Sequence, residues 1–294
     1  MIKKGVYAAT LSVLNENHTL NVDATIKHAE NIIKNGLHGV FFFGSTGQSQ
    51  LISMAEKKEL VSKLPLSKFK KNFFLGTGCN SFNESIDFIN YAMEYGFQTF
   101  LIMPPAYYKG NTEQGVFKFY ENIIKNISKV RIILYNFEKL SGFKFKAEFV
   151  KKLVNAFPKN IIGCKDSTYN LYDNLIIKNF LMFPGDESKL LKGLEIGCSG
   201  CISAVANVTH KLAREVFDNF EKKIPQTTNE KLITVRKTFD KFNLISALHS
   251  FMSTKNIIFK NILPPLTLLT SKEQKELKDE LENLKFNLDK DMAA

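Results

Sequence analysis

Short, continuously apolar segments alternate along this chain with longer segments in which apolar residues recur every three or four positions, up to about residue 221. The continuous runs, such as Phe41-Phe42-Phe43, are typical of strands covered on both faces, as in a parallel sheet. The longer segments have helical periodicity. One of them follows Ser81, a favoured N-cap residue, and ends before Gly96. The alternation predicts successive β-α-β units.

The number of apolar runs predicts how the sheet closes. Parallel strands that each precede a helix form a closed barrel when there are eight of them. We therefore predict a (β/α)8 TIM barrel over residues 1–224. The candidate strands are Val6–Leu14, Gly39–Phe43, Phe73–Gly76, Thr99–Met103, Arg131–Tyr135, Ile161–Lys165, Leu181–Gly185 and Cys201–Ser203.

The pattern changes after about Pro225, where strand signals cease. Two or three helices are expected there, one around Asn229–His249 and another around Lys272–Phe286. We predict that residues 225–294 form a C-terminal helical extension packed beside the barrel.

A doubly wound sheet is the alternative architecture, and it requires a phosphate-binding glycine loop after an early strand. Gly76-Thr77-Gly78 lacks the third glycine of a dinucleotide fingerprint because position 81 is Ser. The turn from Gly44 to Gly47 lacks the lysine of a Walker loop. The barrel is therefore favoured.

The formal net charge of +11 raises the question of a polyanionic partner. Of the 40 basic residues, however, only Arg131, Arg214 and Arg236 are arginines, and the lysines are spread along the chain. Arginine is the preferred side chain for bidentate contacts to phosphates and bases. We therefore expect no nucleic-acid partner, although the charge is expected to steer anionic substrates toward the protein.

The cysteines Cys79, Cys164, Cys198 and Cys201 are too few for a disulfide framework and suit a reducing compartment. Cys198 and Cys201 have the spacing of a zinc or redox pair, but no second pair or histidine stands at ligand spacing, so no metal is expected. No apolar run approaches the ~20 residues of a membrane-spanning helix. We expect a cytoplasmic protein without a membrane partner.

Catalytic groups of a barrel come from the C-terminal ends of its strands. The second predicted strand ends in Gly44-Ser45-Thr46-Gly47-Gln48, where glycines and hydroxyls adjoin exposed amides. Such a turn can hold a carboxylate, although a glycine-bearing turn is also a common structural device.

The sixth predicted strand ends at Lys165, and the fifth ends at Tyr135. Burial lowers the pKa of a lysine and leaves a nucleophilic amine that can attack a ketone. The alternative is a solvated loop lysine paired with Asp166. Tyr135 can transfer protons, or it can be an ordinary hydrogen-bonded aromatic. The coincidence of carboxylate turn, phenol and lysine at the ends of three strands favours an active site.

These segments also carry a resemblance to a known family that covers nearly the whole chain. The chain resembles the class I pyruvate-dependent aldolases and lyases, which include dihydrodipicolinate synthase, N-acetylneuraminate lyase and 2-keto-3-deoxygluconate aldolase. The motifs, in family order, are Gly44–Gln48, Gly76–Gly78, Pro105–Tyr108, Tyr135-Asn136, Gly163–Ser167 and Gly185–Glu187.

The resemblance implies roles for several of these residues. Lys165 forms the Schiff base with pyruvate, Tyr135 relays protons, and Ser45, Thr46 and Gly47 hold the pyruvate carboxylate. No metal or organic cofactor is implied. Tyr107-Tyr108 resembles the tyrosine pair of the family, in which the second member, here Tyr108, reaches toward the active site of a partner subunit. A homotetramer is expected accordingly.

Members of the family differ in the loop after the Tyr-Asn pair. The synthases have a proline and then an arginine that binds the carboxylate of aspartate semialdehyde, whereas this chain has Glu138 at the first position and Leu140 at the second. Lys139 carries a positive charge, but it lacks the planar guanidinium with which an arginine binds a carboxylate through two hydrogen bonds. Leu140-Ser141-Gly142 is more similar to the N-acetylneuraminate lyases, although Gln48 replaces their usual glutamate. The positions that hold the sugar tail in those lyases correspond here to Ser167, Gly185, Asp186, Glu187 and Ser203.

We therefore expect a lyase that cleaves or forms a 2-keto-3-deoxy sugar acid such as N-acetylneuraminate, giving pyruvate and an aldehyde. The first alternative is dihydrodipicolinate synthase, which condenses pyruvate with aspartate semialdehyde. The second is a non-catalytic keto-acid-binding protein built on the same barrel.

Overall fold

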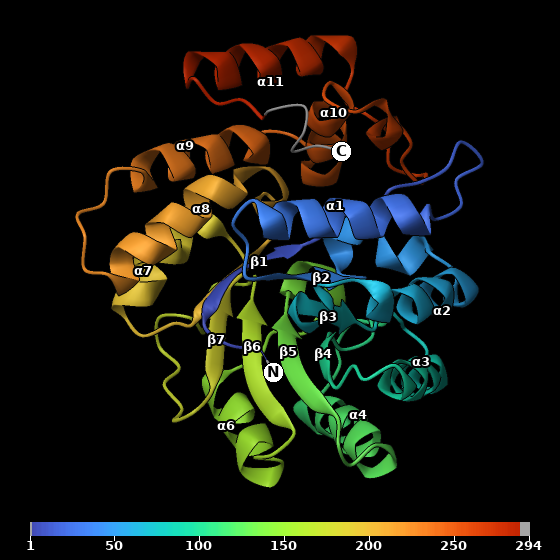
Figure 1. Ribbon diagram of the computed structural model, residues 1–294. Coiled ribbons are helices and arrows are strands. Elements are labelled where there is room, and N and C mark those ends of the chain that lie inside the picture. The colour runs from blue at the N-terminus through green and yellow to red at the C-terminus, as the bar shows by residue number, and fades with distance from the viewer. Residues whose placement is uncertain (1, 289–294) are drawn as a thin grey trace.

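The computed structural model describes residues 2–288 and contains the predicted barrel (Figure 1). Eight parallel strands lie in the order β7-β6-β5-β4-β3-β2-β1-β8. Ser199 N–H donates to Met182 O at 2.7 Å, which brings the start of the last strand against β7 and nearly closes the cylinder. The strands are β1 Gly5–Ala9, β2 Gly39–Phe42, β3 Phe73–Gly76, β4 Thr99–Ile102, β5 Arg131–Asn136, β6 Ile161–Asp166, β7 Leu181–Pro184 and β8 Gly200–Ser203.

Helices surround the strands, and a further group lies on one side of the barrel beside α8 and α1 (Figure 1). The helices of the barrel are α1 Val22–Lys34, α2 Met54–Lys63, α3 Phe82–Glu94, α4 Glu113–Asn126, α5 Glu138–Ser141, α6 Ala147–Ala156, α7 Leu190–Glu195 and α8 Ala206–Glu221. Those that follow are α9 Asn229–Asp240, α10 Leu244–Ser253 and α11 Ser271–Asn283.

The helix signals read from the sequence coincide with the ends of α3. The Ser81 side chain accepts a hydrogen bond from Glu84 N–H at 3.3 Å, which satisfies one of the free amides of the first turn. Gly96, just after the helix, has a φ of +89°, a conformation that glycine adopts without strain. Both signals are confirmed.

Residues of the continuous apolar runs point alternately into two buried layers, one inside the barrel and one between the strands and the helices, as expected for a parallel sheet. Phe41 packs with Phe74 and Phe183 inside the barrel, whereas Phe42 packs in the layer between the strands and the helices. Neighbouring residues on a strand point to opposite faces. Both faces are therefore apolar because both are buried.

The predicted first strand, Val6–Leu14, is too long. The strand ends at Ala9, and the N–H groups of Leu11 and Val13 donate to side-chain oxygens instead of a neighbouring strand. Leu14 forms only an isolated bridge with Leu20. The apolar run continues because Leu11 and Val13 belong to the cluster that packs the barrel against α9 and α10.

The predicted helix Asn229–His249 is two helices. α9 ends at Asp240, and α10 begins after Asn243, whose side chain accepts a hydrogen bond from Ser246 N–H at 3.2 Å. The prediction of a single helix overlooked this N-cap, a position at which asparagine is favoured. The helix predicted around Lys272–Phe286 corresponds to α11. The predicted division between residues 224 and 225 falls between α8 and α9, and residues 289–294 of the predicted extension lie outside the described range.

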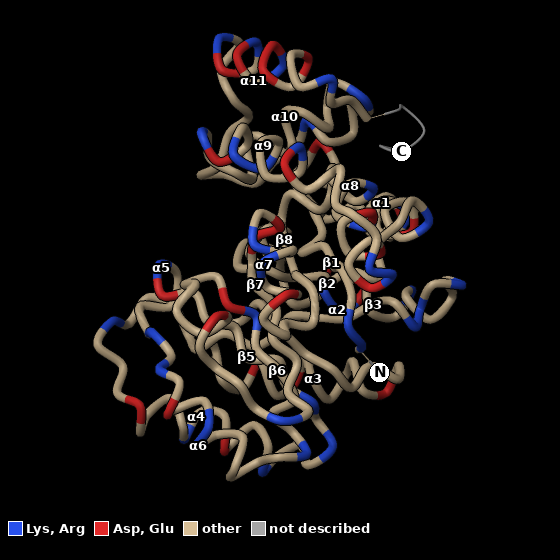
Figure 2. Tube along the Cα trace, turned by 90° about the vertical axis from the view of Figure 1, so that its left-hand side faces the viewer, with Lys and Arg blue, Asp and Glu red and all other residues tan. Residues whose placement is uncertain are grey.

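Helix α11 is the outermost element of this group, and basic and acidic residues alternate along it (Figure 2). Its inner face buries Leu277 and Leu281 in the same cluster that contains Phe239 of α9 and Leu248 of α10. In residues 2–288, no helix combines the length and the apolar character required to cross a bilayer.

Candidate active site

The ends of three strands bring Lys165, Tyr135 and Ser45 together. Tyr135 and Lys165 are direct partners in the register of β5 and β6, so their side chains share the inner face of the barrel. Lys165 is 3% exposed, and its Nζ lies 3.4 Å from the Tyr135 hydroxyl and 4.4 Å from the centre of that ring. The hydroxyl in turn lies 3.1 Å from Ser45 Oγ. The three residues form a chain of polar atoms that we call the lysine cluster.

Lys165 is not a solvated loop residue paired with Asp166, so that alternative is wrong. Strand β6 extends through Asp166, and no carboxylate of residues 2–288 lies within ion-pair distance of Lys165. Asp166 is fully buried, and Asn136 Nδ2 donates to it at 2.8 Å. Its oxygens also accept four backbone N–H groups, those of Thr168, Tyr169, Leu171 and Tyr172.

The turn after β2 has an unusual backbone. Phe43 and Gln48, on either side of it, have φ values of +59° and +52°, a region that costs a non-glycine residue about 1–3 kcal/mol. A Cβ on Gly47 would lie 2.9 Å from Thr10 O, so only glycine fits without displacement. Ser12 Oγ donates to Gly47 O at 2.7 Å and holds the turn from the β1 side. Tertiary contacts therefore maintain a conformation that the sequence alone disfavours.

This turn presents polar groups that can bind a carboxylate. Ser45–Gly47 is a single 3-10 turn whose first hydrogen bond runs from Gly47 N–H to Gly44 O at 3.2 Å. The N–H groups of Ser45 and Thr46 precede that bond, and no acceptor for them occurs within residues 2–288. Such adjacent amides form an anion-binding concavity.

A cavity of about 120 Å³ adjoins the lysine cluster at the C-terminal end of the barrel. Ser45 and Tyr135 line one side of it, and Leu140, which is 38% exposed, lines another. The remaining walls are formed mainly by Phe43, Gly44, Ser49, Thr77, Gly78, Leu101 and Met103. The cavity joins the carboxylate turn to the loop in which family members differ.

Lys57 of α2 is a buried residue that the sequence analysis did not identify. Its Nζ donates to Gly78 O at 2.8 Å and to Thr77 O at 3.3 Å, and both of these residues line the cavity. Burial lowers the pKa of Lys57, and the nearby Cys79 thiol opposes that shift. No sequence signal indicates this role, because Lys57 stands among charged residues in an ordinary amphipathic helix.

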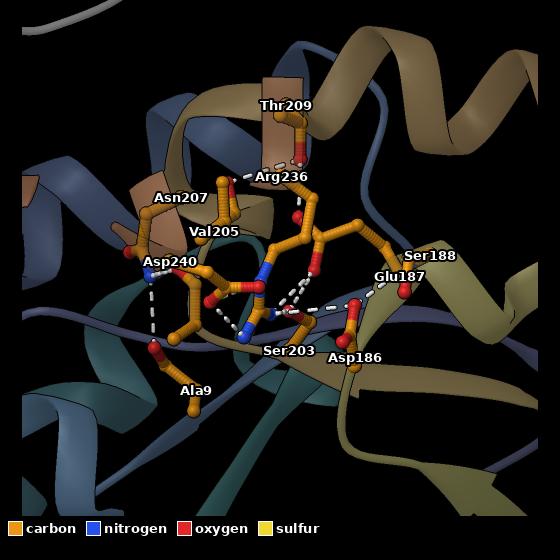
Figure 3. A network of polar contacts seen from close by, with 11 residues as sticks. Ala9, Asp186, Glu187, Ser188, Ser203, Val205, Asn207, Thr209, Arg236 and Asp240 are labelled. Atoms are coloured by element: carbon orange, nitrogen blue, oxygen red, sulfur yellow. Dashed lines mark hydrogen bonds and ion pairs between the residues drawn. The ribbon is translucent and has the colours of Figure 1, made fainter. Parts of the chain in front are cut away.

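Asp186, Glu187 and Ser203 lie at the ends of β7 and β8, where Arg236 of α9 joins them (Figure 3). Arg236 is 6% exposed, and its Nη1 lies 3.1 Å from Glu187 Oε2, 3.1 Å from Ser203 Oγ and 3.6 Å from Asp186 Oδ1. Ser203 and Glu187 also hydrogen-bond to each other. We call these four residues the arginine cluster.

Further contacts complete the arginine cluster. Thr209 donates to Glu187 at 2.9 Å, and Arg236 Nε donates to Asp240 at 2.9 Å. Burial by itself lowers the pKa of Arg236, but the charges of Glu187 and Asp186 raise it above the ordinary value of arginine. No pattern in the sequence predicts this role for Arg236, which lies far along the chain from Glu187 and Ser203.

Three other predicted positions are placed as follows. Ser167, half-buried after β6, is packed so closely against Gly185 that any larger residue at 185 would clash with its hydroxyl. Tyr108 is separate from the lysine cluster in the single chain and is 75% exposed. Gln48 points away from the cavity, since its Oε1 accepts a hydrogen bond from Leu263 N–H at 3.0 Å.

Comparison with known proteins agrees with this geometry. The sequence model of the Dihydrodipicolinate synthetase family matches residues 3–284. The 4-hydroxy-tetrahydrodipicolinate synthase of Bartonella bacilliformis is 31% identical over 221 residues, which are 73% of this chain and 74% of that protein. The 2-dehydro-3-deoxy-D-gluconate/2-dehydro-3-deoxy-phosphogluconate aldolase of Picrophilus torridus is 27% identical over 252 residues, 81% of this chain and 92% of that protein. In fold, the crystal structure of dihydrodipicolinate synthase from Agrobacterium tumefaciens superimposes with a TM-score of 0.87 at 24% identity, covering 96% of this chain and 99% of that one.

Proposed function

Because this chain belongs to the dihydrodipicolinate synthetase family, whose members are pyruvate-dependent Schiff-base lyases, we propose that Lys165 is the residue that forms the Schiff base. The observation that supports this assignment is the buried contact of 3.4 Å between Lys165 Nζ and the Tyr135 hydroxyl. No carboxylate of residues 2–288 lies within ion-pair distance of this buried amine. The amine can therefore act as a nucleophile toward a ketone.

The reaction begins when the neutral amine of Lys165 attacks C2 of a 2-keto acid. The carboxylate of the substrate binds the N–H groups of Ser45 and Thr46. The C2 oxygen leaves as water, with one proton from the amine and one delivered through Tyr135, and an iminium remains. The Tyr135 hydroxyl, between Nζ and Ser45 Oγ, is positioned for that transfer.

The iminium then accepts the electrons of the C3–C4 bond. Tyr135 removes the proton from the C4 hydroxyl, the bond breaks, and an aldehyde departs while the electron pair forms an enamine on C3. Protonation of C3 and addition of water to the iminium release pyruvate and regenerate Lys165. The balance requires one water molecule lost and one regained, and no oxidant or metal.

We propose that the substrate is a 2-keto-3-deoxy sugar acid. Leu140 contributes an apolar wall to the cavity, and no arginine lines it. Within residues 2–288, Arg214 and Arg236 are paired with carboxylates, and Arg131 stands at the first position of β5, at the opposite end of the barrel. A substrate with a hydroxylated tail requires no arginine of the kind that binds the carboxylate of aspartate semialdehyde in the synthases. Ser167, Gly185 and Asp186 remain the proposed positions for the tail. Glu187 and Ser203, which are fully buried and bonded to Arg236, are proposed as supports of that site and not as contacts with the substrate.

Dihydrodipicolinate synthesis is the second candidate. It is favoured by the 31% identity to a synthase over 73% of this chain. Both reactions use the same Lys165 adduct and differ only in the aldehyde.

The decisive experiment measures pyruvate release from N-acetylneuraminate and from 2-keto-3-deoxy sugar acids beside a synthase assay with aspartate semialdehyde. We expect sugar-acid cleavage to have the higher kcat/KM. Synthase turnover above about 10⁴ M⁻¹s⁻¹ with no cleavage of any sugar acid would replace the first candidate by the second. Binding of 2-keto acids without turnover in either assay would instead support a non-catalytic protein.

We also propose a homotetramer built from tight dimers. Tyr107 and Tyr108 are 80% and 75% exposed in the single chain, and a partner subunit would cover them. Their rings are in edge-to-face contact at 5.2 Å. Sedimentation velocity at micromolar concentration should give one species of four chains, and a monomer alone would contradict the proposal.

A further inference from the structure

A second cavity lies at the other end of the barrel from Lys165. It has a volume of about 820 Å³ and is lined by the N-terminal residues of β3, β4 and β5, namely Phe73, Thr99 and Arg131. Tyr7 and Phe74 form its inner wall, and they belong to the apolar cluster that fills the barrel interior. The cavity is therefore closed off from the active site by packed side chains. We call it the lower cavity.

The charged side chains that line the lower cavity are all basic. Its lining contains no Asp or Glu, and within residues 2–288 none of its basic side chains forms an ion pair. Some lysines elsewhere on the molecule do have a carboxylate neighbour, as Lys58 does with Asp87 at 2.6 Å. The basic residues of the lower cavity are Lys3, Lys4, Lys70, Lys71 and Arg131.

Arg131 provides the most specific sign of a ligand. Arg214 pairs with Asp218 at 2.8 Å, and Arg236 is held by the arginine cluster. Arg131 is half-buried at the start of β5, and no described residue accepts a hydrogen bond from its guanidinium. A guanidinium has five N–H donors in a planar fork suited to phosphate or carboxylate. Its donors are therefore available to a ligand that enters the lower cavity.

The other walls are aromatic and uncharged. Tyr7, Phe74, Tyr95 and Phe97 all line the lower cavity. His38 adds no charge near neutral pH, because burial and the neighbouring Arg214 lower its pKa to about 4. Tyr7, Phe74 and Phe97 are at most 8% exposed, whereas Tyr95 is 37% exposed and offers an accessible ring. Such a ring beside a basic rim suits a ligand with a planar body and an anionic group.

We propose that the lower cavity binds a phosphorylated small molecule of the nucleoside diphosphate class. The phosphates contact Arg131 and the pair Lys70 and Lys71, and the planar base lies against the accessible ring of Tyr95. The volume lies within the range of about 300–1,000 Å³ that is usual for small-molecule sites. This site is independent of the proposed function because Lys165 is at the opposite end of the strands.

Titration calorimetry with ADP, pyrophosphate and adenosine tests the proposal. We expect one ADP per chain, weaker binding of pyrophosphate, and no detectable binding of adenosine. Reducing the enzyme with borohydride in the presence of pyruvate blocks Lys165, and ADP binding should be unchanged. ADP binding that disappears on this treatment would assign the nucleotide to the active site and overturn the proposal.

Variants separate a specific site from attraction by the net charge of +11. Arg131→Gln should weaken ADP binding by about tenfold or more, since a bidentate charge-assisted contact is lost. Lys70→Gln/Lys71→Gln should weaken it as well. Lys272→Gln/Lys275→Gln removes the same charge from the exposed face of α11 and should change the affinity less than about twofold.

Equal losses in the two lysine pairs would show non-specific attraction and overturn the proposal. Absence of ADP binding to the wild type would do the same. Pyrophosphate binding as tight as that of ADP would show that the planar base adds nothing to the affinity, and it would contradict the proposed contact of the base. A circular dichroism spectrum of each variant guards against loss of fold, and Arg131 has no side-chain hydrogen bond within residues 2–288 whose removal would destabilise the chain.

Discussion

The lysine cluster and the arginine cluster both lie at the C-terminal ends of barrel strands, and both bury charged side chains, but they differ in how completely those charges are paired. Among residues 2–288, Lys165 has one hydrogen-bond partner, the Tyr135 hydroxyl, at a long 3.4 Å. Glu187 accepts hydrogen bonds from Ser203, Thr209 and Arg236. Within residues 2–288, the arginine cluster has almost no unused hydrogen-bonding capacity, whereas the amine of Lys165 uses little of its own.

This difference separates a structural role from a chemical one. A buried ion pair with every atom bonded fixes the positions of the elements that supply it, in this case β7, β8 and α9. A buried amine with one weak contact is costly until a substrate binds to it. Substitutions should therefore affect activity at the first cluster and stability at the second.

The largest effect is expected for Lys165→Met, which removes the nucleophile. Lyase activity should fall on the order of 10⁴-fold or more. The midpoint of urea unfolding should be unchanged or higher, because methionine fills the space without burying a polar amine that has a single hydrogen-bond partner. A large loss of stability would show that Lys165 is a structural residue. It would remove the contrast between the lysine cluster and the arginine cluster.

Tyr135→Phe should lower kcat by about 10²–10⁴-fold, the usual contribution of a general acid–base group. Binding of pyruvate should change much less, because the carboxylate turn is intact. Steady-state kinetics separate the two parameters. Tyr91→Phe is a matched control, since its hydroxyl hydrogen-bonds to Tyr95 on the surface of the protein, away from the lysine cluster. An equal loss of kcat in both variants would exclude the relay.

Arg236→Met should destabilise the protein by about 3–5 kcal/mol, because it leaves the Glu187 carboxylate buried without its counter-charge. Urea denaturation measures the loss. The double variant Arg236→Met/Glu187→Gln should recover part of it, because the unpaired charge is removed as well. Failure of the second substitution to recover any stability would indicate that packing, and not charge, makes the residue important.

Leu140→Arg should produce the smallest change, a gain of about 1.5–3 kcal/mol in binding of aspartate semialdehyde, or roughly tenfold to a hundredfold. The substitution places a guanidinium in the cavity beside the lysine cluster. This group can pair with the carboxylate of aspartate semialdehyde. The ratio of synthase to sugar-acid activity measures the gain, with Leu140→Met as the control. An unchanged ratio would mean that residue 140 does not face the tail of the aldehyde.

The two clusters also differ in how far the sequence predicted them. Lys165 and Tyr135 were predicted because the apolar pattern fixes where β5 and β6 end, and the ends of adjacent parallel strands meet in space. Arg236 was not predicted, because it lies on a later helix whose docking depends on tertiary packing. The overlong first strand has the same cause, since Leu11 and Val13 are apolar for contact with that group of helices.

Trapping of the pyruvate adduct tests the central claim most directly. The enzyme is treated with borohydride in the presence of pyruvate, digested, and analysed by mass spectrometry. We predict one reduced pyruvyl group on the peptide that contains Lys165, in the wild type and in any folded Arg236→Met protein, and none in Lys165→Met. An adduct on a different lysine, or none in the wild type, would contradict the assignment of Lys165 as the Schiff-base residue.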